Sequence, residues 1–379
     1  MSQFSVRCVV YRGGTSRGIF FHEKDLPTSN ELKHRIFLEG IDAYNPSQVN
    51  GLGSGTSHTS KIMVISEPTV EGADLDYTFY QIGIGEQVVD DKGTCGNLMA
   101  AIGAFAVDEG LVSTNSNDDF ITVSAFNKNI NKMIKMRVPL SNGKAKVSGD
   151  YLMPGIVTPG AKIIVNIISP GGGRTGKTIP IGLKTKIVTR KRSYEASFVD
   201  IVNPFVYVAA SDFGIVGSEL NHVVGADHEL LSELEKIRLK MAVAGGIAKN
   251  EDEAKNIPSI PKIAVVASPH DYVTSTGKHI KANDIDIVAK MVSMKKFHRT
   301  FAGSGLYNLA ATALLEGTVP NQYSRKKDGS VEQIIRIGHP EGIAEVRVAL
   351  TEEQADVASV GLDRTARRII KGDLYISEK

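Results

Sequence analysis

The hydrophobic and polar positions in the first third of the chain follow the short period of β-strands. Four segments are rich in β-branched and aromatic residues and end at glycine or polar turns: residues 4–11, 18–21, 61–65 and 76–82. The last alternates between apolar and polar side chains, as a strand with one buried face does. A helix is predicted over residues 29–40, because Ser29 or Asn30 can cap its start and Gly40 can end it.

Residues 97–109 show a different pattern, an Ala-rich and almost wholly apolar segment that stops at Gly110. Its length favours a helix, and a helix without a polar face is buried on all sides. The sequence therefore predicts a central helix wrapped by a sheet.

The rest of the chain continues as a mixture of strands and helices. Residues 120–201 are typical of strands separated by Gly and Pro turns. Beyond them the patterns predict strands over residues 205–210 and 262–267, and helices over residues 226–244, 285–294 and 301–317.

One segment of the chain is repeated. Residues 93–112 read Gly-Thr-Cys-Gly-Asn, an apolar helix, Asp-Glu-Gly and Leu-Val, and residues 302–319 read Ala-Gly-Ser-Gly, an apolar helix, Glu-Gly and Thr-Val. A chain of 379 residues is also long for one hydrophobic core. We therefore expect two similar domains, residues 1–184 and 185–379, with a C-terminal strand that can return to the first domain.

Composition excludes several classes of function. Lys plus Arg total 44 and Asp plus Glu 42, so no excess charge points to nucleic acid or an anionic membrane. No apolar stretch approaches the roughly 18 residues that span a bilayer, and the first residues lack the apolar run of a signal peptide. Two cysteines, Cys8 and Cys95, cannot form a disulfide framework. We expect a cytoplasmic protein with reduced thiols.

Cys95 is the first candidate for chemistry. It lies in a glycine-containing turn that leads into the apolar helix, where unpaired backbone N–H groups and the helix dipole favour negative charge. A thiol in such a place can act as an acid or base, and the same N–H groups can hold a carboxylate. The alternative is a small buried residue beside a turn.

Lys61 is the second candidate, and it follows a loop rich in Gly, Ser and Thr, residues 51–60. Such a loop offers many donors for carboxylates, and a lysine at its edge can clamp an anion or serve as a base if burial depresses its pKa. The alternative is a surface lysine on a solvated loop. The turn at residues 12–18, Arg-Gly-Gly-Thr-Ser-Arg-Gly, can likewise orient an acid or be a hairpin turn and nothing more.

A nucleotide-binding loop and a metal site are not supported. Residues 171–178 fit the P-loop pattern, but Pro180 and Gly182 stand where the helix of a P-loop must begin. The nine histidines form no HExxH motif, the two cysteines form no CxxC motif, and no GxSxG elbow is present. We expect neither a metal nor a cofactor.

Taken together, four motifs resemble the PrpF-type methylaconitate isomerase family, with order and spacing that match across nearly the whole chain. They are Arg-Gly-Gly-Thr-Ser-Arg-Gly at 12–18, Thr-Ser-Lys at 59–61, Cys-Gly-Asn at 95–97 and His-Arg-Thr-Phe-Ala-Gly-Ser-Gly at 298–305. Residues 143–149 and 336–342 look closest to the 3-methylitaconate Δ-isomerase branch.

The resemblance implies the α+β diaminopimelate-epimerase fold, in which two similar domains each curl a mainly antiparallel sheet around a central helix, with the active site between them. It also implies cofactor-independent isomerisation of a small unsaturated polycarboxylate, such as methylaconitate, aconitate, methylitaconate or oxalomesaconate. The catalytic pair would be Lys61 and Cys95. Substrate contacts would come from Thr15, Ser16, Arg17, Ser60, Gly96, Asn97, Asn203, Gly303, Ser304 and Gly305. A homodimer is implied by the family alone.

Two departures from the wider superfamily bear on the reaction. The epimerases carry a second cysteine where this chain has Ser304, which disfavours racemisation with a thiol on each face. Arg17 stands where many relatives have lysine, which keeps the charge and can change substrate choice. The remaining rival is a carboxylate-binding protein without activity, but binding alone requires no thiol.

Overall fold

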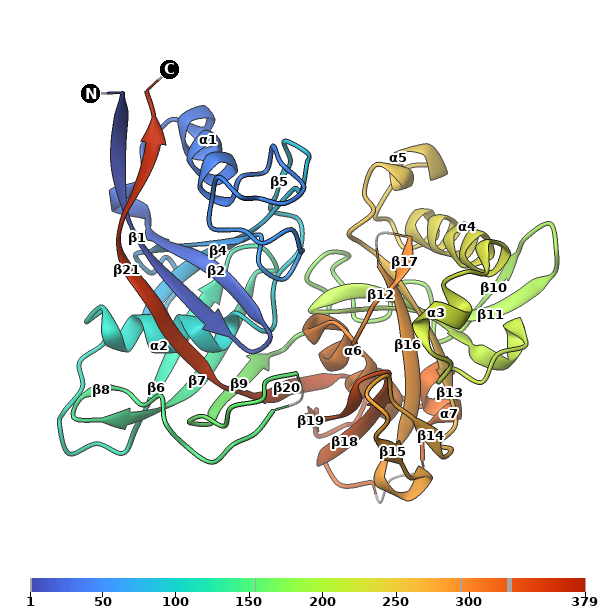
Figure 1. Cartoon of the computed structure of the whole chain (residues 1–379). Helices are drawn as coiled ribbons and strands as arrows, with labels where there is room; N and C mark the ends of the chain where they lie inside the picture. The colour runs from blue at the N-terminus through green and yellow to red at the C-terminus, as the bar shows by residue number, and fades with distance from the viewer. Residues whose placement is uncertain (1, 154, 294, 326–328, 379) are drawn as a thin grey trace. The chain divides into compact units, whose positions relative to one another are not determined.

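The chain folds into two compact units (Figure 1). The computed structural model describes residues 2–153, 155–293, 295–325 and 329–378. Unit 1 consists of Met1–Asn166 and Asp363–Lys379, and unit 2 of Ile167–Leu362. The expected division at residue 184 therefore differs from this one. The chain returns to unit 1 at its C-terminus, where β21 (Ala366–Ser377) pairs with β1 (Gln3–Gly13).

Unit 1 is built on one mixed sheet. After β1 come β2 (Ser16–His22), β3 (Lys61–Ser66), β4 (Leu75–Ile82), β6 (Phe120–Asn127) and β7 (Lys132–Ser141). Pairing along this series is antiparallel for β1–β2, parallel for β2–β3, antiparallel for β3–β4, parallel for β4–β6 and antiparallel for β6–β7. The strands predicted in the first third are thus confirmed.

Helix α2 (Met99–Asp108) fills the inside of this sheet. Every residue from Met99 to Val107 is buried, and the helix contacts β1 and β21 as well as β6 and β7. The sheet therefore curls around it, as the lack of a polar face predicts. The ring of Phe105 stacks on Phe20 at 5.5 Å between centroids, and the Tyr11 hydroxyl donates to Asp108 at 2.7 Å.

Helix α1 (Asn30–Ile41) packs on the other face of the sheet. Its cap is Ser29, whose side chain accepts from Leu32 N, as predicted. Its end differs from the prediction: Gly40 lies inside the helix, and Asp42 takes the left-handed conformation that closes it. Packing explains the glycine, because a Cβ at position 40 would lie 2.8 Å from Leu374 Cδ2.

Unit 2 repeats the pairing series of unit 1. Its strands are β10 (Thr185–Val188), β11 (Ser193–Ile201), β12 (Asn203–Ala209), β13 (Lys262–Ala267), β16 (Ile287–Ser293), β18 (Glu332–His339), β19 (Gly342–Leu350) and, as far as Leu362, β20 (Val357–Arg364). From β11 to β19 the pairs are antiparallel, parallel, antiparallel, parallel and antiparallel. Helix α6 (Gly303–Leu314) comes between β16 and β18 as α2 does between β4 and β6, and it is buried almost throughout. The repeated segment thus marks a repeated fold.

The helix predicted over residues 285–294 is wrong, because this segment forms strand β16. Its run of Ile, Val, Ala and Met lacks the alternation of a half-exposed strand, so periodicity alone did not separate strand from helix. The structure supplies the reason: β16 is central, between β13 and β18, and its residues from Ile287 to Val292 are all buried. Such a strand reads as a continuous apolar run. Met294 lies outside the described residues.

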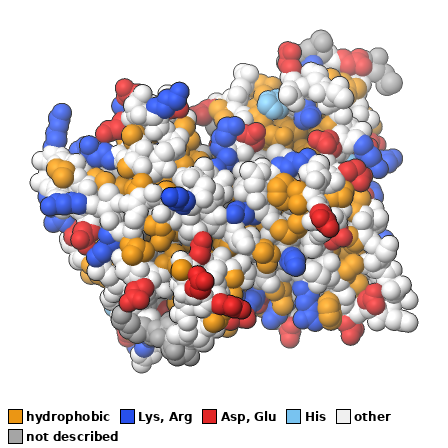
Figure 2. Space-filling view, turned by 180° about the vertical axis from the view of Figure 1, so that it is seen from behind, with side chains coloured by type: hydrophobic (Ala, Val, Ile, Leu, Met, Phe, Trp, Pro, Cys, Tyr) orange, Lys and Arg blue, Asp and Glu red, His pale blue; other side chains and the backbone are white. Residues whose placement is uncertain are grey.

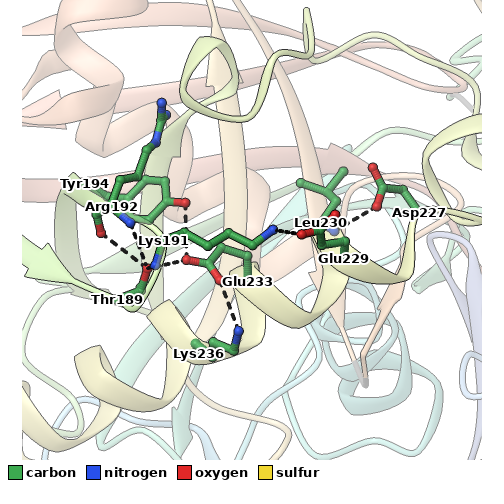
Figure 3. Close-up of polar contacts among 9 residues, drawn as sticks. All are labelled: Thr189, Lys191, Arg192, Tyr194, Asp227, Glu229, Leu230, Glu233 and Lys236. Carbon is green, nitrogen blue, oxygen red and sulfur yellow. Dashed lines mark hydrogen bonds and ion pairs between the residues drawn. The ribbon is translucent and has the colours of Figure 1, made fainter.

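The second face of the unit 2 sheet is covered by α4 (His228–Ala244), which polar contacts tie to the β10–β11 hairpin (Figure 3). Glu233 is only 2% exposed and accepts hydrogen bonds from Thr189, from Tyr194 at 3.2 Å and from Lys236 at 3.2 Å. These bonds lower the pKa of its carboxyl group, although burial alone would raise it.

The remaining elements are short. They are β5 (Val89–Asp90), β8 (Lys144–Ala145), β9 (Ile163–Ile168), β14 (Tyr272–Val273), β15 (His279–Ile280), β17 (Lys296–Phe297), α3 (Asn221–Val224), α5 (Glu251–Lys255) and α7 (Val319–Tyr323). In the described part of the chain, no helix combines the length and the apolar character that crossing a membrane requires. On the face shown in Figure 2, basic and acidic side chains are intermixed.

Candidate active site

The turn between β1 and β2 is a two-residue hairpin, Gly14 and Thr15, with Gly13 paired to Ser16. Gly14 has φ of 53°, a conformation that a glycine adopts without strain. The turn lies directly against the segment before α2: a Cβ on Gly14 would come within 2.6 Å of Asn97 Oδ1, and one on Gly13 within 2.8 Å of Asn97 O. Two sequence motifs far apart in the chain thus meet at one place.

Lys61 is the first residue of β3 and is buried, with 9% of its surface exposed. Its Nζ donates to Gln81 Oε1 at 2.6 Å and lies 5.0 Å from the centroid of the Phe79 ring. Burial lowers the pKa of the ammonium group, and an electrostatic interaction with Cys95 partly opposes this effect. The alternative interpretation of Lys61, a surface lysine on a solvated loop, is therefore wrong.

Gln81 is the partner of Lys61, and no sequence motif singled it out. It faces Lys61 across the β3–β4 pair, and its Nε2 donates to Ser60 O at 2.8 Å and Ser57 O at 3.1 Å. These two bonds fix the amide so that Oε1 points to the lysine. The alternating pattern of β4 did contain a signal for Gln81, because it is the polar residue on a strand face that otherwise carries Tyr77 and Phe79.

Cys95 lies in a turn that precedes α2, with 8% of its surface exposed. The helix itself starts later than predicted, at Met99 with Leu98 as its N-cap, rather than at Asn97. The thiol is 3.9 Å from Ser16 Oγ, at the hairpin turn. The Coulombic effect of Cys95 on Lys61 places both groups within electrostatic reach of each other.

Two buried asparagines hold the cysteine-bearing segment on the sheet. Asn127 Nδ2 donates to Thr94 Oγ1 at 2.7 Å, and Asn129 Nδ2 donates to Asp91 O at 2.9 Å. The two are joined, since Asn129 N donates to Asn127 Oδ1 at 2.9 Å. Cys95 is thus positioned by residues at the end of β6 that no sequence pattern singled out.

The other predicted residues of unit 1 gather around the same turn, although several are occupied by internal contacts. Asn97 Nδ2 donates to Thr15 Oγ1 at 3.0 Å, and Gly96 separates Asn97 from Cys95. Arg17 holds the Gly/Ser/Thr loop through Nη2 to Leu52 O at 2.9 Å. The Ser60 hydroxyl is fully buried and donates to Gln48 Oε1 and Thr56 O at 2.9 and 2.8 Å, so it stabilises this loop.

The predicted residues of unit 2 meet at the start of α6. Asn203 Nδ2 donates to Ser304 Oγ at 3.0 Å, and both side chains are buried. Gly303 is the first residue of the helix, and a Cβ on Gly305 would lie 2.6 Å from Phe205 Cζ. Among the residues that the structure describes, the Asn203 Oδ1 atom has no hydrogen-bond partner, which is costly for a buried carbonyl.

Asn203 is held by a strained and strongly bonded turn. Val202, which connects β11 to β12, has φ of 62°, a conformation that is unfavourable for a β-branched residue. Asn308 of α6 fixes the turn, since its Nδ2 donates to the carbonyls of Val199, Ile201 and Asn203 at 3.0, 3.0 and 2.9 Å.

As predicted, the segment that fits the P-loop pattern leads into turns and not into a helix. Residues 172–184 are turns and bends up to β10. Its backbone donors are also occupied, because Arg174 N and Thr175 N donate to the buried carboxylate of Asp200 at 2.8 and 2.7 Å. The carboxylate thus takes the place that a phosphate has in a true P-loop. In the portions of the chain covered by the structure, no cluster of three or more His, Cys, Asp or Glu side chains is suited to a metal.

Comparison with known proteins agrees with this arrangement. The family model described as PrpF protein matches residues 3–377, so the chain belongs to the PrpF family. The 3-methylitaconate isomerase of Eubacterium barkeri is 37% identical over 379 residues, covering 99% of this chain and 98% of the relative. The 2-methyl-aconitate isomerase of Shewanella oneidensis is 31% identical over 385 residues, covering 98% of this chain and 96% of the relative. By family the chain is an isomerase.

Solved structures confirm the fold. The crystal structure of a methylitaconate-delta-isomerase superimposes with a TM-score of 0.85 at 36% identity, covering 100% of this chain and 97% of that chain. A hydroxyproline epimerase from Agrobacterium vitis, 10% identical, superimposes with a TM-score of 0.55, covering 99% of this chain and 93% of that one. The fold is therefore of the diaminopimelate-epimerase type, as the resemblance implies.

Proposed function

We propose that the chain is a cofactor-independent isomerase that moves a proton, and with it a double bond, in a small unsaturated di- or tricarboxylate. The single observation that carries this proposal is the burial of the Lys61 amine. This amine shares an electrostatic environment with a thiol, in a site lined by hydrogen-bond donors. The isomerase relatives support the same class of substrate, since their names specify methylitaconate and methyl-aconitate.

The proposed proton carriers are Lys61 and Cys95. Because its pKa is lowered, the Lys61 amine can be neutral at a pH where an ordinary lysine is charged. The neutral amine removes a proton from the carbon beyond the double bond, which yields an ammonium and a dienolate. The Cys95 thiol then gives its proton to the other end of the dienolate, and proton transfer from the ammonium to the thiolate restores both groups. General acid–base transfer of this kind contributes roughly 10²–10⁴-fold.

The main barrier to this reaction is the negative charge of the dienolate, which backbone and side-chain donors can stabilise. In unit 1 the turn at Gly96 and Asn97 and the hairpin at Thr15 and Ser16 would supply donors close to Cys95. Arg17 follows Ser16 in sequence and would need to exchange its bond to Leu52 O for one to the substrate. Removing one preorganised donor of this kind by mutagenesis commonly raises the barrier by about 2.7–4 kcal/mol.

Within unit 2, the start of α6 can hold a carboxylate through Gly303, Ser304 and Gly305, where helix N–H groups are unpaired. Asn203 supports this assignment. If its amide turns over, the Ser304 hydroxyl donates to Oδ1, and Nδ2 becomes a donor for the carboxylate. The buried carbonyl that lacks a partner thereby gains one on binding.

The alternative function is a carboxylate-binding protein without activity. A protein that only binds carboxylates does not require a lysine of lowered pKa beside a thiol, whereas this site contains both. A racemase with two thiols is disfavoured, because unit 2 has Ser304 where such an enzyme needs the second one. We also infer a cytoplasmic location, because Cys8 and Cys95 are both free thiols. The homodimer stays a prediction.

The proposal is tested by incubating the purified chain, after treatment with EDTA, with methylitaconate, trans-aconitate, methylaconitate and oxalomesaconate. Proton NMR then follows the signals of the acid and its isomer. We expect one acid to equilibrate with its double-bond isomer, and Cys95→Ala to slow this by at least about 100-fold. Binding of these acids with no interconversion of any would instead favour the binding-protein alternative.

A further inference from the structure

Arg364 is a buried cation at the end of β20 that the function above does not use. The residue is 7% exposed, and its Nε donates to Asn97 Oδ1 at 2.9 Å while Nη1 donates to the carbonyl of Asp363 at 2.9 Å. Within the described ranges no carboxylate forms an ion pair with it, and its third nitrogen, Nη2, has no hydrogen-bond partner. The guanidinium is thus oriented by neutral groups alone.

Two arginines of unit 2, Arg238 and Arg336, differ in this respect, whereas the partly buried Arg12 and Arg17 of unit 1 are also held by neutral groups. The Arg238 guanidinium pairs with Glu235 at 2.7 Å, and that of Arg336 pairs with Asp286 at 3.0 Å. The nearest carboxylate in sequence to Arg364, that of Asp363, is directed to Lys162 at 3.6 Å. A buried charge without a counter-ion is unfavourable, so an anion supplied by a ligand would offset the cost.

The location of Arg364 connects it with the catalytic residues of unit 1. Its partner Asn97 donates to Thr15 at 3.0 Å, and the neighbouring Ser16 lies 3.9 Å from the Cys95 sulfur. The next residue, Thr365, fixes the same hairpin turn, because its carbonyl accepts from Gly14 N at 2.9 Å. One guanidinium nitrogen of Arg364 therefore lies beside the segment that carries Asn97 and Cys95, where it can donate to a ligand.

From these contacts we infer that Arg364 binds a carboxylate of the substrate, one that is not conjugated with the forming dienolate. It is thus a specificity-determining residue. Guanidinium groups suit this task because their planar donors match a carboxylate. Such a contact is made equally in the ground state and the transition state, so it affects KM and leaves kcat nearly unchanged. The inference rests on the proposed function for its substrate, but the contact itself can be tested without turnover.

The test is calorimetric titration with tricarballylate, a saturated tricarboxylate that has no double bond to shift. We expect Arg364→Gln, which keeps an amide beside Asn97 but removes the charge, to weaken binding by about 10- to 100-fold. The matched control is Arg367→Gln, which removes the same charge from an exposed position three residues away. It should bind as the unchanged chain does.

Two further measurements separate recognition from a structural defect. Added guanidinium ions should restore part of the affinity in Arg364→Ala, which a merely misfolded site would not allow. With an acid that the enzyme isomerises, Arg364→Gln should raise KM and leave kcat nearly unchanged. Equal affinity of Arg364→Gln and the unchanged chain for tricarballylate would overturn the inference. Absence of isomerisation in the unchanged chain would count against the proposed function alone.

Discussion

Lys61 shows how one side chain can be costly for stability and useful for chemistry. Its amine is buried against Phe79 and receives a single side-chain partner, the neutral amide of Gln81. Burial favours the neutral amine, which lowers the pKa and makes the group a better base near neutral pH. The same burial makes the charged form unfavourable in the folded chain.

Lys61→Met should therefore abolish isomerisation and raise the melting temperature. In the folded chain the lysine pKa lies below its unfolded value of about 10.4. Between these two pKa values the unfolded chain binds more protons, so the stability of the unchanged protein increases as pH rises. The advantage of the methionine variant should be largest at pH values below the lowered pKa and shrink as pH rises toward about 10.4. Thermal melts at several pH values measure it.

The control for this prediction is Lys92→Met, at a side chain that is 65% exposed and pairs only with neighbouring Asp91. It should change neither the activity nor the pH dependence of the melting temperature. If Lys61→Met melted at the same temperature as the unchanged protein at every pH, the burial argument for the lowered lysine pKa would be wrong.

At the scale of elements, hydrogen bonds between distant segments hold the proposed site residues in place. The cysteine turn is anchored by Asn127 and Asn129 after β6, and Asn203 is fixed by Asn308 of α6. These contacts explain which site residues the sequence could reveal. Lys61 and Cys95 stand in local motifs, whereas Gln81 and Arg364 acquire their partners only when distant strands meet.

Glu233 of α4 gives a prediction of acid stability at this scale. Hydrogen bonds from Thr189, Tyr194 and Lys236 favour the charged carboxylate and lower its pKa below the unfolded value (Figure 3). A lowered pKa adds stability that is present above the unfolded value, about 4.3, and is lost as pH falls through the folded value. Glu233→Gln should lower the melting temperature at pH 7, and this deficit should shrink as pH falls below about 4.3 and through the lowered pKa of the folded chain.

The matched variant is Glu229→Gln on the same helix, where the side chain is 76% exposed and paired with Lys191. An exposed pair contributes little, so its melting temperature should hardly change. A deficit of Glu233→Gln that persisted undiminished at low pH would show that the carboxylate charge is not what stabilises the α4 contact.

The whole molecule contains the same fold twice. The sequence predicted this repeat, but the division that it predicted between the two copies differs from the one in the structure. The apolar helices at Met99–Asp108 and Gly303–Leu314 were found because a helix without a polar face needs a sheet around it. The division between the two units differs from the predicted one, because it depends on which strands pair. Strand β16 was taken for a helix for a related reason, since burial on both faces removes the alternation.

The central claim is that Lys61 and Cys95 transfer a proton to and from the carbon skeleton of an unsaturated acid. It is tested most directly by NMR of the equilibrated acid in D₂O with the unchanged chain, Lys61→Met and Cys95→Ser, each verified as folded. The account predicts deuterium at the carbon that gains a proton with the unchanged chain, and at least a 100-fold slower incorporation with either variant. Equal rates of incorporation in all three proteins would contradict it.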